Sequence, residues 1–293
     1  MRPTWAERLA PIAFVLVWST GFIGSKYTVP YAPPFSLLTI RLSVASVALA
    51  ILSLVFQSTW PRTREAYQRS TLIGVLLHGG YLGAVFVSIE MGLPVAVAAL
   101  IVCLQPVCVA ALSQPVLGTS LTRRQWTGIA LGLAGVLVVL APGLAAGVGA
   151  DGYAPTAVLV GAVALVCSTV ATLLQKKHGQ GIPMLPGTAI QYAAAAAVLF
   201  VAALAFDRRP VLWTPQFIGA LAWMVIALSI GAVLLMFWLL RRGTAAGFSS
   251  LYYLVPPVTL MMGYLLFGQT LAPVALVGFA ISSLGVLLVR DTP

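Results

Sequence analysis

Charged side chains are scarce in this sequence, and acidic ones are the scarcest. Of the 293 residues, 8% are charged and six are Asp or Glu, whereas 60% are hydrophobic. Soluble globular domains carry about 25% charged residues. The composition therefore excludes an ordinary soluble domain and predicts a polytopic membrane protein.

The positions of the few acids disfavour one class of transporter. Predicted tails or loops hold five of the six, which are Glu7, Glu65, Asp151, Asp207 and Asp291. We therefore expect no carboxylate near the bilayer midplane. Exporters that exchange a cationic drug for a proton use an ionisable group buried inside the membrane. A multidrug or organic-cation/proton antiporter stays an alternative, but the sequence weakens it.

Cysteine and histidine are also few. Cys103, Cys108 and Cys167 lie inside predicted spans without the spacing of a metal site, and His78 and His178 supply neither a metal cluster nor a catalytic triad. We expect no metal, no cofactor and no enzymatic activity. The net charge of +10 comes from basic residues between apolar runs, where they set membrane orientation rather than bind nucleic acid.

Long apolar runs are what the sequence has in abundance. About 20 apolar residues cross a bilayer core as a helix, and turn or charge signals separate ten such runs. They cover residues 9–29, 34–56, 70–91, 94–113, 123–141, 154–177, 185–206, 214–240, 244–267 and 271–290. We predict an all-α polytopic membrane protein with ten transmembrane helices, whose partner is the lipid bilayer.

An internal repeat divides these helices into two halves. The stretch Leu104-Gln105-Pro106 returns 150 residues later as Leu254-Val255-Pro256, and the register still holds at Gly135 and Gly285. We predict two five-helix repeats, residues 1–142 and 154–293, joined by a linker at 143–153.

Most Lys and Arg residues fall on one side of the predicted membrane, which favours both termini in the cytoplasm. Each half has an odd number of spans, so the second half is inverted relative to the first. Proline removes a backbone hydrogen bond and clashes with the preceding turn. Pro106, Pro256 and Pro257 should therefore break their helices, and inverted-repeat transporters bind substrate between broken helices near the midplane.

Polar and aromatic side chains near the middle of several spans are candidates for substrate binding. They are Trp18, Ser19, His78, Tyr81, Gln105, Ser168, Thr172, Gln175, Ser249, Tyr252 and Tyr253. Residues three or four apart share a helical face, and several of these form such stripes. We expect the stripes to line a central cavity, aromatic on one side and hydroxyl-rich on the other. The alternative is that the hydroxyl groups only bond neighbouring helices.

Two of these residues have competing interpretations. His78 could be a hydrogen-bonded packing residue or a proton carrier, and we favour a pocket residue that donates or accepts a hydrogen bond. Gln105 could recognise an amino or carboxyl group, or it could satisfy the backbone groups that Pro106 frees. The sequence leaves this second choice open.

Three charged residues fall in the outer part of their predicted spans: Lys26, Arg41 and Glu90. We hypothesise that Glu90 pairs with Lys26 or Arg41 in an outer gate or vestibule. The alternative is that each long side chain reaches the membrane interface independently.

Small residues at spacing four mark the fifth and tenth spans, namely Gly128 with Gly132 and Gly278 with Ser282. Such pairs allow helices to pack closely. We expect these two helices to form the scaffold, and the first, third, fourth, sixth, eighth and ninth to surround the transport path.

The first two spans also carry a family resemblance. A first helix with Trp18-Ser19-Thr20-Gly21-Phe22 and Lys26 at its end, followed by Pro34-Phe35 and Arg41, resembles the EamA-type members of the drug/metabolite transporter superfamily. Overall, the sequence is most similar to the YddG-type amino-acid exporters. The resemblance implies a monomeric exporter in the bacterial cytoplasmic (inner) membrane. Its small-molecule substrates would be neutral metabolites, amino acids including aromatic ones, moved by alternating access.

Overall fold

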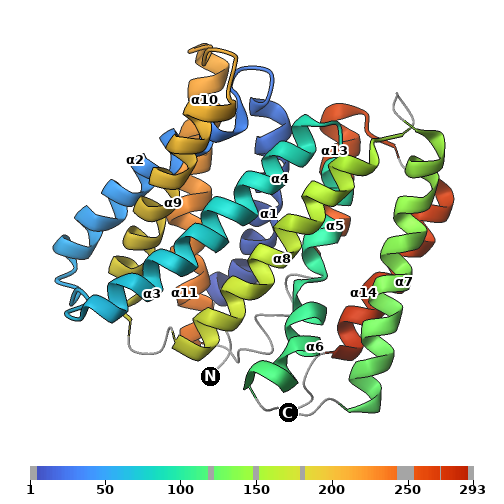
Figure 1. Cartoon of the computed structure of the whole chain (residues 1–293), viewed down its shortest axis with the longest axis horizontal. Coiled ribbons are helices and arrows are strands. Elements are labelled where there is room, and N and C mark those ends of the chain that lie inside the picture. Colours follow the sequence, from blue (N-terminus) through green and yellow to red (C-terminus); the bar gives the residue numbers. More distant parts are fainter. Residues whose placement is uncertain are drawn as a thin grey trace.

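The computed structural model describes residues 5–117, 122–147, 152–178, 182–242, 254–270 and 272–289, and the regular elements in these ranges are all helices (Figure 1). The first half of the chain contains α1 (Trp5–Thr28), α2 (Pro34–Val55), α3 (Arg64–Gly74), the π-helical segment η1 (Val75–Gly80), α4 (Tyr81–Glu90), α5 (Val95–Cys103), α6 (Gln105–Leu117) and α7 (Arg123–Ala146). The second half contains α8 (Pro155–His178), α9 (Met184–Phe206), α10 (Pro215–Trp223), the π-helical segment η2 (Met224–Ala232), α11 (Val233–Arg242), α13 (Val255–Phe267) and α14 (Pro273–Val289).

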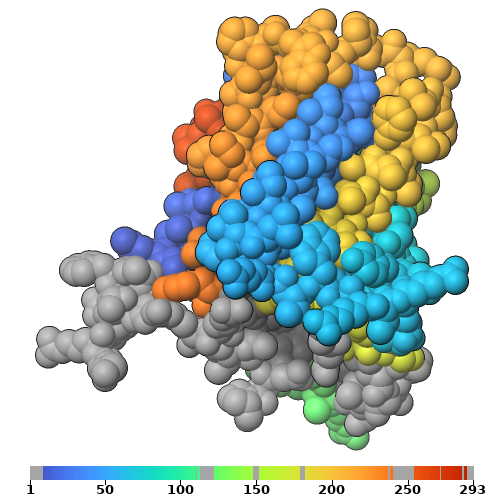
Figure 2. Space-filling model, turned by 90° about the vertical axis from the view of Figure 1, so that its left-hand side faces the viewer, coloured from blue at the N-terminus to red at the C-terminus, as the bar shows by residue number. Residues whose placement is uncertain are grey.

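Helix length and composition confirm a multi-pass membrane protein. Within the described ranges, seven helices are long and apolar enough to cross a membrane, and the apolar helices Val95–Val109, Val255–Phe267 and Pro273–Gly285 are shorter. The predicted number of ten spans therefore stays a prediction. The outer faces of α2 and α9 expose Val47, Leu54, Val201 and Leu204, which lipid accommodates better than water does. Figure 2 shows α2 as a diagonal ridge on this face, between α10 and α9.

Some helix ends differ from the sequence prediction. The third span begins at Arg64 rather than at residue 70, because the Thr63 side chain accepts a hydrogen bond from the Ala66 backbone and caps an earlier turn. The helix α7 continues to Ala146, into the stretch expected to be a linker. It ends at Gly147, whose φ of 73° lies in a region that glycine adopts without steric cost.

The two halves pack through α7 and α14, the predicted scaffold helices. A Cβ atom at Gly135 would lie 2.6 Å from the Gly278 carbonyl oxygen, and one at Gly285 would lie 2.6 Å from the Gly128 carbonyl oxygen. Backbone therefore touches backbone, which confirms close packing through the small residues. Positions that rise along α7 meet positions that fall along α14, so the two helices are antiparallel.

A second antiparallel contact joins α2 to α9. Ser46 donates a hydrogen bond to the Ala189 carbonyl oxygen at 2.8 Å, and the rings of Phe35 and Phe206 lie 6.0 Å apart at the other end. These helices are also the second of each half. In both contacts, equivalent helices of the two halves pack against each other in opposite directions.

The repeated prolines begin new helices. A turn at Leu104 separates α5 from α6, and Pro106 lies in the first turn of α6. Pro256 and Pro257 likewise lie in the first turn of α13, after Leu254. The backbone angles match across the repeat, with φ −73° and ψ −9° at Leu104 and φ −84° and ψ −14° at Leu254. Proline is tolerated at this position because the first turn has no intrahelical acceptor for its missing hydrogen.

Matched π-helical segments are the feature that the sequence analysis did not foresee. In the first half, η1 interrupts the continuous helix that runs from Arg64 to Glu90. In the second half, η2 interrupts the continuous helix that runs from Pro215 to Arg242. The repeat offset of 150 residues carries η1 onto the middle of η2. Such segments are rare and occur frequently at functional sites.

Candidate functional site

The polar centre of the structure begins at Arg41 on α2. Its side chain is 6% exposed, and its Nε donates a hydrogen bond of 3.0 Å to the Ser229 hydroxyl on η2. One terminal nitrogen lies 4.0 Å from the Met224 sulfur. Tyr81 and Tyr192 are close enough to interact electrostatically with the guanidinium group. Helix α2 therefore delivers a positive charge to the π-helical segment of the other half.

At the position in the second half that is equivalent to Arg41, an uncharged amide contacts a histidine. Gln191 on α9 is the repeat partner of Arg41, and its Oε1 lies 3.3 Å from His78 Nε2 on η1. An amide oxygen only accepts, so this contact places the hydrogen on Nε2. The amide nitrogen of Gln191 donates to Gln175 Oε1 on α8 at 3.3 Å. His78 and Gln175 are thus brought together, through a residue that the sequence analysis did not select.

Tyr192 connects the charged pair to the neutral one. Its ring meets the His78 ring edge-on at a centroid distance of 4.6 Å, and its hydroxyl donates to the Ser229 carbonyl oxygen at 3.3 Å. A continuous network therefore runs from Gln175 to Arg41 across α8, α9, η1, η2 and α2. We call the six side chains Gln175, Gln191, His78, Tyr192, Ser229 and Arg41 the central network.

Gln105 makes a different contact from either predicted one. Its amide nitrogen donates to the Ser168 carbonyl oxygen at 3.1 Å and also to the Thr172 hydroxyl, both on α8. The Leu104 N–H, not Gln105, serves the carbonyls of residues 101 and 102 at the break. The contacts of the Gln105 amide nitrogen are thus on α8 and not on the backbone next to Pro106. The break places the side chain against α8 instead, where Ser168 and Thr172 were predicted to form a polar face.

The remaining candidates on α1 are only partly in polar contact. Trp18 packs on Phe14 with ring centroids 5.3 Å apart. Ser19 is fully buried, and its hydroxyl has no hydrogen-bond partner among the described residues.

Three further candidates, Ser249, Tyr252 and Tyr253, lie outside the described residues.

The outer charge cluster has other partners than those predicted. Glu90 forms an ion pair with Arg209, which follows α9, rather than with Lys26 or Arg41. Arg41 lies deeper, against Ser229, because the tilt and register of α2 carry it to η2. Asp207, two residues before Arg209, accepts two hydrogen bonds from Ser36, at 2.7 Å from the backbone nitrogen and 2.6 Å from the hydroxyl. The segment after α9 thus ties together the ends of α2 and α4.

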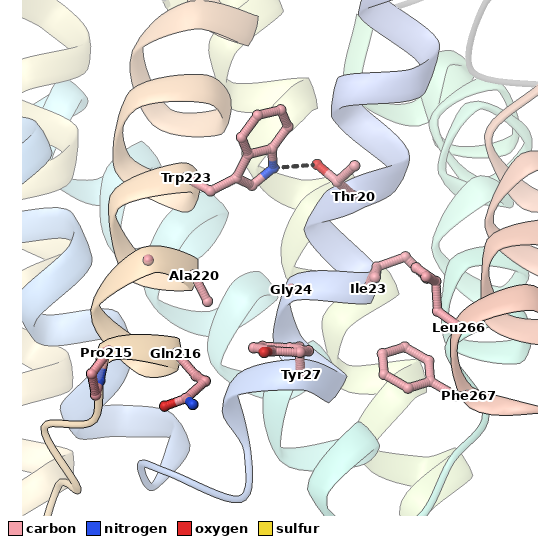
Figure 3. A pocket seen from close by; sticks show the side chains of 11 residues that line it. Thr20, Ile23, Gly24, Tyr27, Pro215, Gln216, Ala220, Trp223, Leu266 and Phe267 are labelled. Atoms are coloured by element: carbon pink, nitrogen blue, oxygen red, sulfur yellow. Dashed lines mark hydrogen bonds between the residues drawn. The ribbon is translucent and has the colours of Figure 1, made fainter.

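A cavity of about 510 Å³ lies between α1, α10 and α13. Figure 3 shows Tyr27 and Thr20 on its α1 side and Trp223 opposite, with the indole donating a 3.0 Å hydrogen bond to the Thr20 hydroxyl. Gln216 and Phe267 line it further toward the end of the bundle. The residues that line this cavity belong to the first, eighth and ninth predicted spans. The sequence analysis expected all three of these helices to surround the transport path.

Several residues of this site escaped the sequence analysis, and some had a detectable signal. Gln191 is an amide inside an apolar run, at the repeat offset from Arg41, and that position identifies it in principle. Tyr192, Ser229 and Trp223 have no such signal, because their roles depend on which helix of the other half faces them.

The sequence matches the EamA-like transporter family over residues 6–141 and again over residues 155–290. Among curated proteins, it is 26% identical to the "uncharacterized inner membrane transporter YedA" of Escherichia coli (strain K12), over 96% of this chain and 89% of the relative. It is 24% identical to the "uncharacterized transporter YvbV" of Bacillus subtilis (strain 168), over 94% and 88%.

A third relative is named as a probable terminal-alkyne amino-acid exporter and comes from Streptantibioticus cattleyicolor. It is 28% identical, over 96% of this chain and 92% of the relative. A solved crystal structure superposes with a TM-score of 0.66 at 20% identity, covering 96% of this chain and 94% of the other. That likeness concerns the fold alone.

Proposed function

The chain belongs to the EamA-like transporter family, and we propose that it exports small neutral metabolites, specifically amino acids including aromatic ones. As a member of this family it is a multi-pass membrane transporter of small molecules rather than an enzyme. The proposal adds the substrate class, the direction and an alternating-access mechanism around a midplane site, as in the YddG-type exporters that the sequence resembles.

The observation that carries the proposal is the central network. It joins both halves of the chain, lies among buried helices, and contains amide, imidazole, phenol and guanidinium groups but no carboxylate. Such groups suit a ligand that is polar, small and neutral overall. One relative is named as an amino-acid exporter, which supports the same substrate class.

Two inverted halves would provide the mechanism. We propose that residues 1–142 and 154–293 form the halves, that 143–153 link them, and that ten spans leave both termini in the cytoplasm. The antiparallel packing of α7 on α14 supports this inversion, because equivalent helices of inverted halves run in opposite directions. Rocking of the halves about that scaffold would expose the central network to one side at a time. A monomer contains both halves and suffices.

Several predicted site residues would serve this path. His78, Tyr81, Gln175 and Gln105 would line its midplane part, and the cavity beside Trp223 would form its outer mouth. The candidates for the same wall are Ser19, Trp18, Ser168 and Thr172, together with Ser249, Tyr252 and Tyr253, which lie outside the described residues. The Glu90–Arg209 pair would close the outer side.

A multidrug or organic-cation/proton antiporter is the alternative that the test must separate. Its cation would meet the positive charge of Arg41 in the central network, where like charges repel. The structure offers that alternative no specific support.

Counterflow in proteoliposomes tests the proposal. Purified protein would be reconstituted with unlabelled amino acid inside, and uptake of labelled leucine or phenylalanine would be followed with and without a proton gradient. We expect saturable exchange of both amino acids, and a protein-free liposome is the control. No exchange of any amino acid, together with uptake of a cationic dye that depends on the gradient, would refute the proposal in favour of the antiporter.

A further inference from the structure

The guanidinium group of Arg41 is a buried positive charge without a counterion in the part of the chain that the structure describes. The side chain is 6% exposed, and its hydrogen-bond partners among the described residues are a hydroxyl oxygen and a thioether sulfur. Both partners are electrically neutral. The charge is therefore solvated only by dipoles.

The three acids whose side chains the structure describes have partners elsewhere. Glu65 pairs with Arg69, Glu90 pairs with Arg209, and Asp207 accepts hydrogen bonds from Ser36. Removing a charge from water costs several kcal/mol even after the surroundings relax. In membrane proteins such charges are rare and mark functional sites. A group that arrives from outside the chain is therefore the natural counterion.

Among the described residues, Nε and one terminal nitrogen of Arg41 have partners, and the second terminal nitrogen has no hydrogen-bond acceptor. Ser229 takes the Nε hydrogen at 3.0 Å and thereby fixes the plane of the group. The terminal nitrogens form the remaining fork, and the Met224 sulfur at 4.0 Å is a weak acceptor for one of them. A planar fork of two N–H donors matches a carboxylate, which it binds through two parallel hydrogen bonds.

Resting on the function proposed above, we infer that Arg41 binds the carboxylate of the transported amino acid. The assignment makes the carboxylate a requirement for transport. An amino acid then satisfies Arg41, whereas the corresponding amine leaves the charge buried and unpaired. The transporter accordingly selects amino acids against decarboxylated amines of the same side chain.

Competition in counterflow is the test. Labelled phenylalanine would be exchanged in the presence of unlabelled phenylalanine, phenylalaninamide or phenethylamine, with wild type and the variants Arg41→Gln and Arg41→Lys. Arg69→Gln is the matched control, because it removes an arginine whose ion pair with Glu65 is exposed. We expect phenylalanine alone to compete in wild type and in the control. Losing one partner of a buried charge pair costs about 2 kcal/mol or more, so Arg41→Gln should raise the half-saturating concentration about 30-fold or more.

Thermal unfolding in detergent separates a binding role from a structural one. Phenylalanine should raise the Tm of wild type, and phenethylamine should not, because a ligand stabilises the protein only where it binds. Arg41→Gln should keep or raise the Tm without ligand, since it removes an uncompensated charge, and should lose the response to phenylalanine.

The outcomes are distinguishable. Exchange of amino acids by wild type that persists in Arg41→Gln with an unchanged half-saturating concentration would overturn the role of Arg41 alone. A lower Tm of Arg41→Gln without ligand would assign Arg41 to the structure and also overturn it. No amino-acid exchange by wild type would overturn the proposed function together with this inference.

Discussion

Replacing Gly135 by alanine should destabilise the transporter, whereas the same change at Gly132, one turn away on α7, should not. A Cβ at Gly135 would lie 2.6 Å from the Gly278 carbonyl oxygen and 2.7 Å from the Ser282 Cα, both backbone atoms of α14. A Cβ at Gly132 would lie 3.4 Å from the nearest side-chain atoms of Leu104 and Val107, an ordinary contact.

The magnitude follows from the displacement that alanine requires. To restore a 3.4 Å contact from the 2.6 Å distance to the Gly278 oxygen, α7 and α14 must separate by at least 0.8 Å at that point, because the Ser282 backbone nitrogen is closer still. Overpacking a well-packed interior costs about 1–3 kcal/mol. Alanine also improves helix propensity by about 0.8–1 kcal/mol, but it does so equally at both positions. The difference in stability between the two variants therefore isolates the contact between backbones.

Thermal unfolding at one fixed scan rate in detergent is the assay, because irreversible unfolding makes the Tm depend on scan rate. At about 2–4 °C per kcal/mol for a chain of this order of size, Gly135→Ala should melt about 2–12 °C below Gly132→Ala. Gly285→Ala makes the mirrored contact with Gly128 and Gly132 and should match Gly135→Ala. Equal Tm values for Gly135→Ala and Gly132→Ala would refute the contact, and a stable Gly285→Ala would refute its symmetry.

Three further sets of substitutions probe the polar contacts. His78→Ala should raise the half-saturating concentration for amino-acid counterflow about tenfold. His78→Gln keeps a hydrogen-bond donor toward α9 and should recover most of the affinity. Unchanged transport in both variants would favour a packing role for His78. Gln105→Leu removes two hydrogen bonds to α8 and should cost about 1–3 kcal/mol of stability, read as a Tm lower by several degrees, while a Tm equal to wild type would contradict the bond between α6 and α8. Glu90→Gln and Arg209→Gln should couple in a double-mutant thermal cycle by about 0.2–1 kcal/mol, since the pair is partly exposed, and Glu90→Gln should show no coupling with Lys26→Gln.

The sequence alone predicted those features of the fold that depend on one segment or on the internal repeat. Proline chemistry predicted helix breaks at Pro106 and Pro256, and in the described residues α6 and α13 begin next to these prolines. The offset of 150 residues explains why Leu104 and Leu254 share a backbone conformation. The small residues of α7 and α14 likewise indicated close packing, because their spacing reflects a local requirement for bare backbone.

The hydrogen-bond and ion-pair partners of the polar side chains could not be predicted from the sequence. Glu90 has several basic residues within plausible reach, and only the placement of the segment after α9 selects Arg209. For Gln105 the sequence offered a substrate group or the backbone freed by Pro106, whereas the packing of α6 against α8 gives it the Ser168 carbonyl oxygen. The π-helical segments have no local signature comparable to proline, so their matched positions emerge only from the structure.

The two halves have kept their glycines and changed their polar residues, and the proposed substrate gives a reason for the difference. Gly135 and Gly285 face the same constraint, because each touches the backbone of the other half. Arg41 and Gln191 occupy equivalent positions on α2 and α9, and each reaches a π-helical segment of the other half, but one is charged and the other is neutral. A perfectly symmetric site would present the same group twice. An amino acid has a carboxylate at one end of its backbone and an ammonium at the other, so a single arginine opposite an amide matches its polarity, whereas two arginines would repel the ammonium.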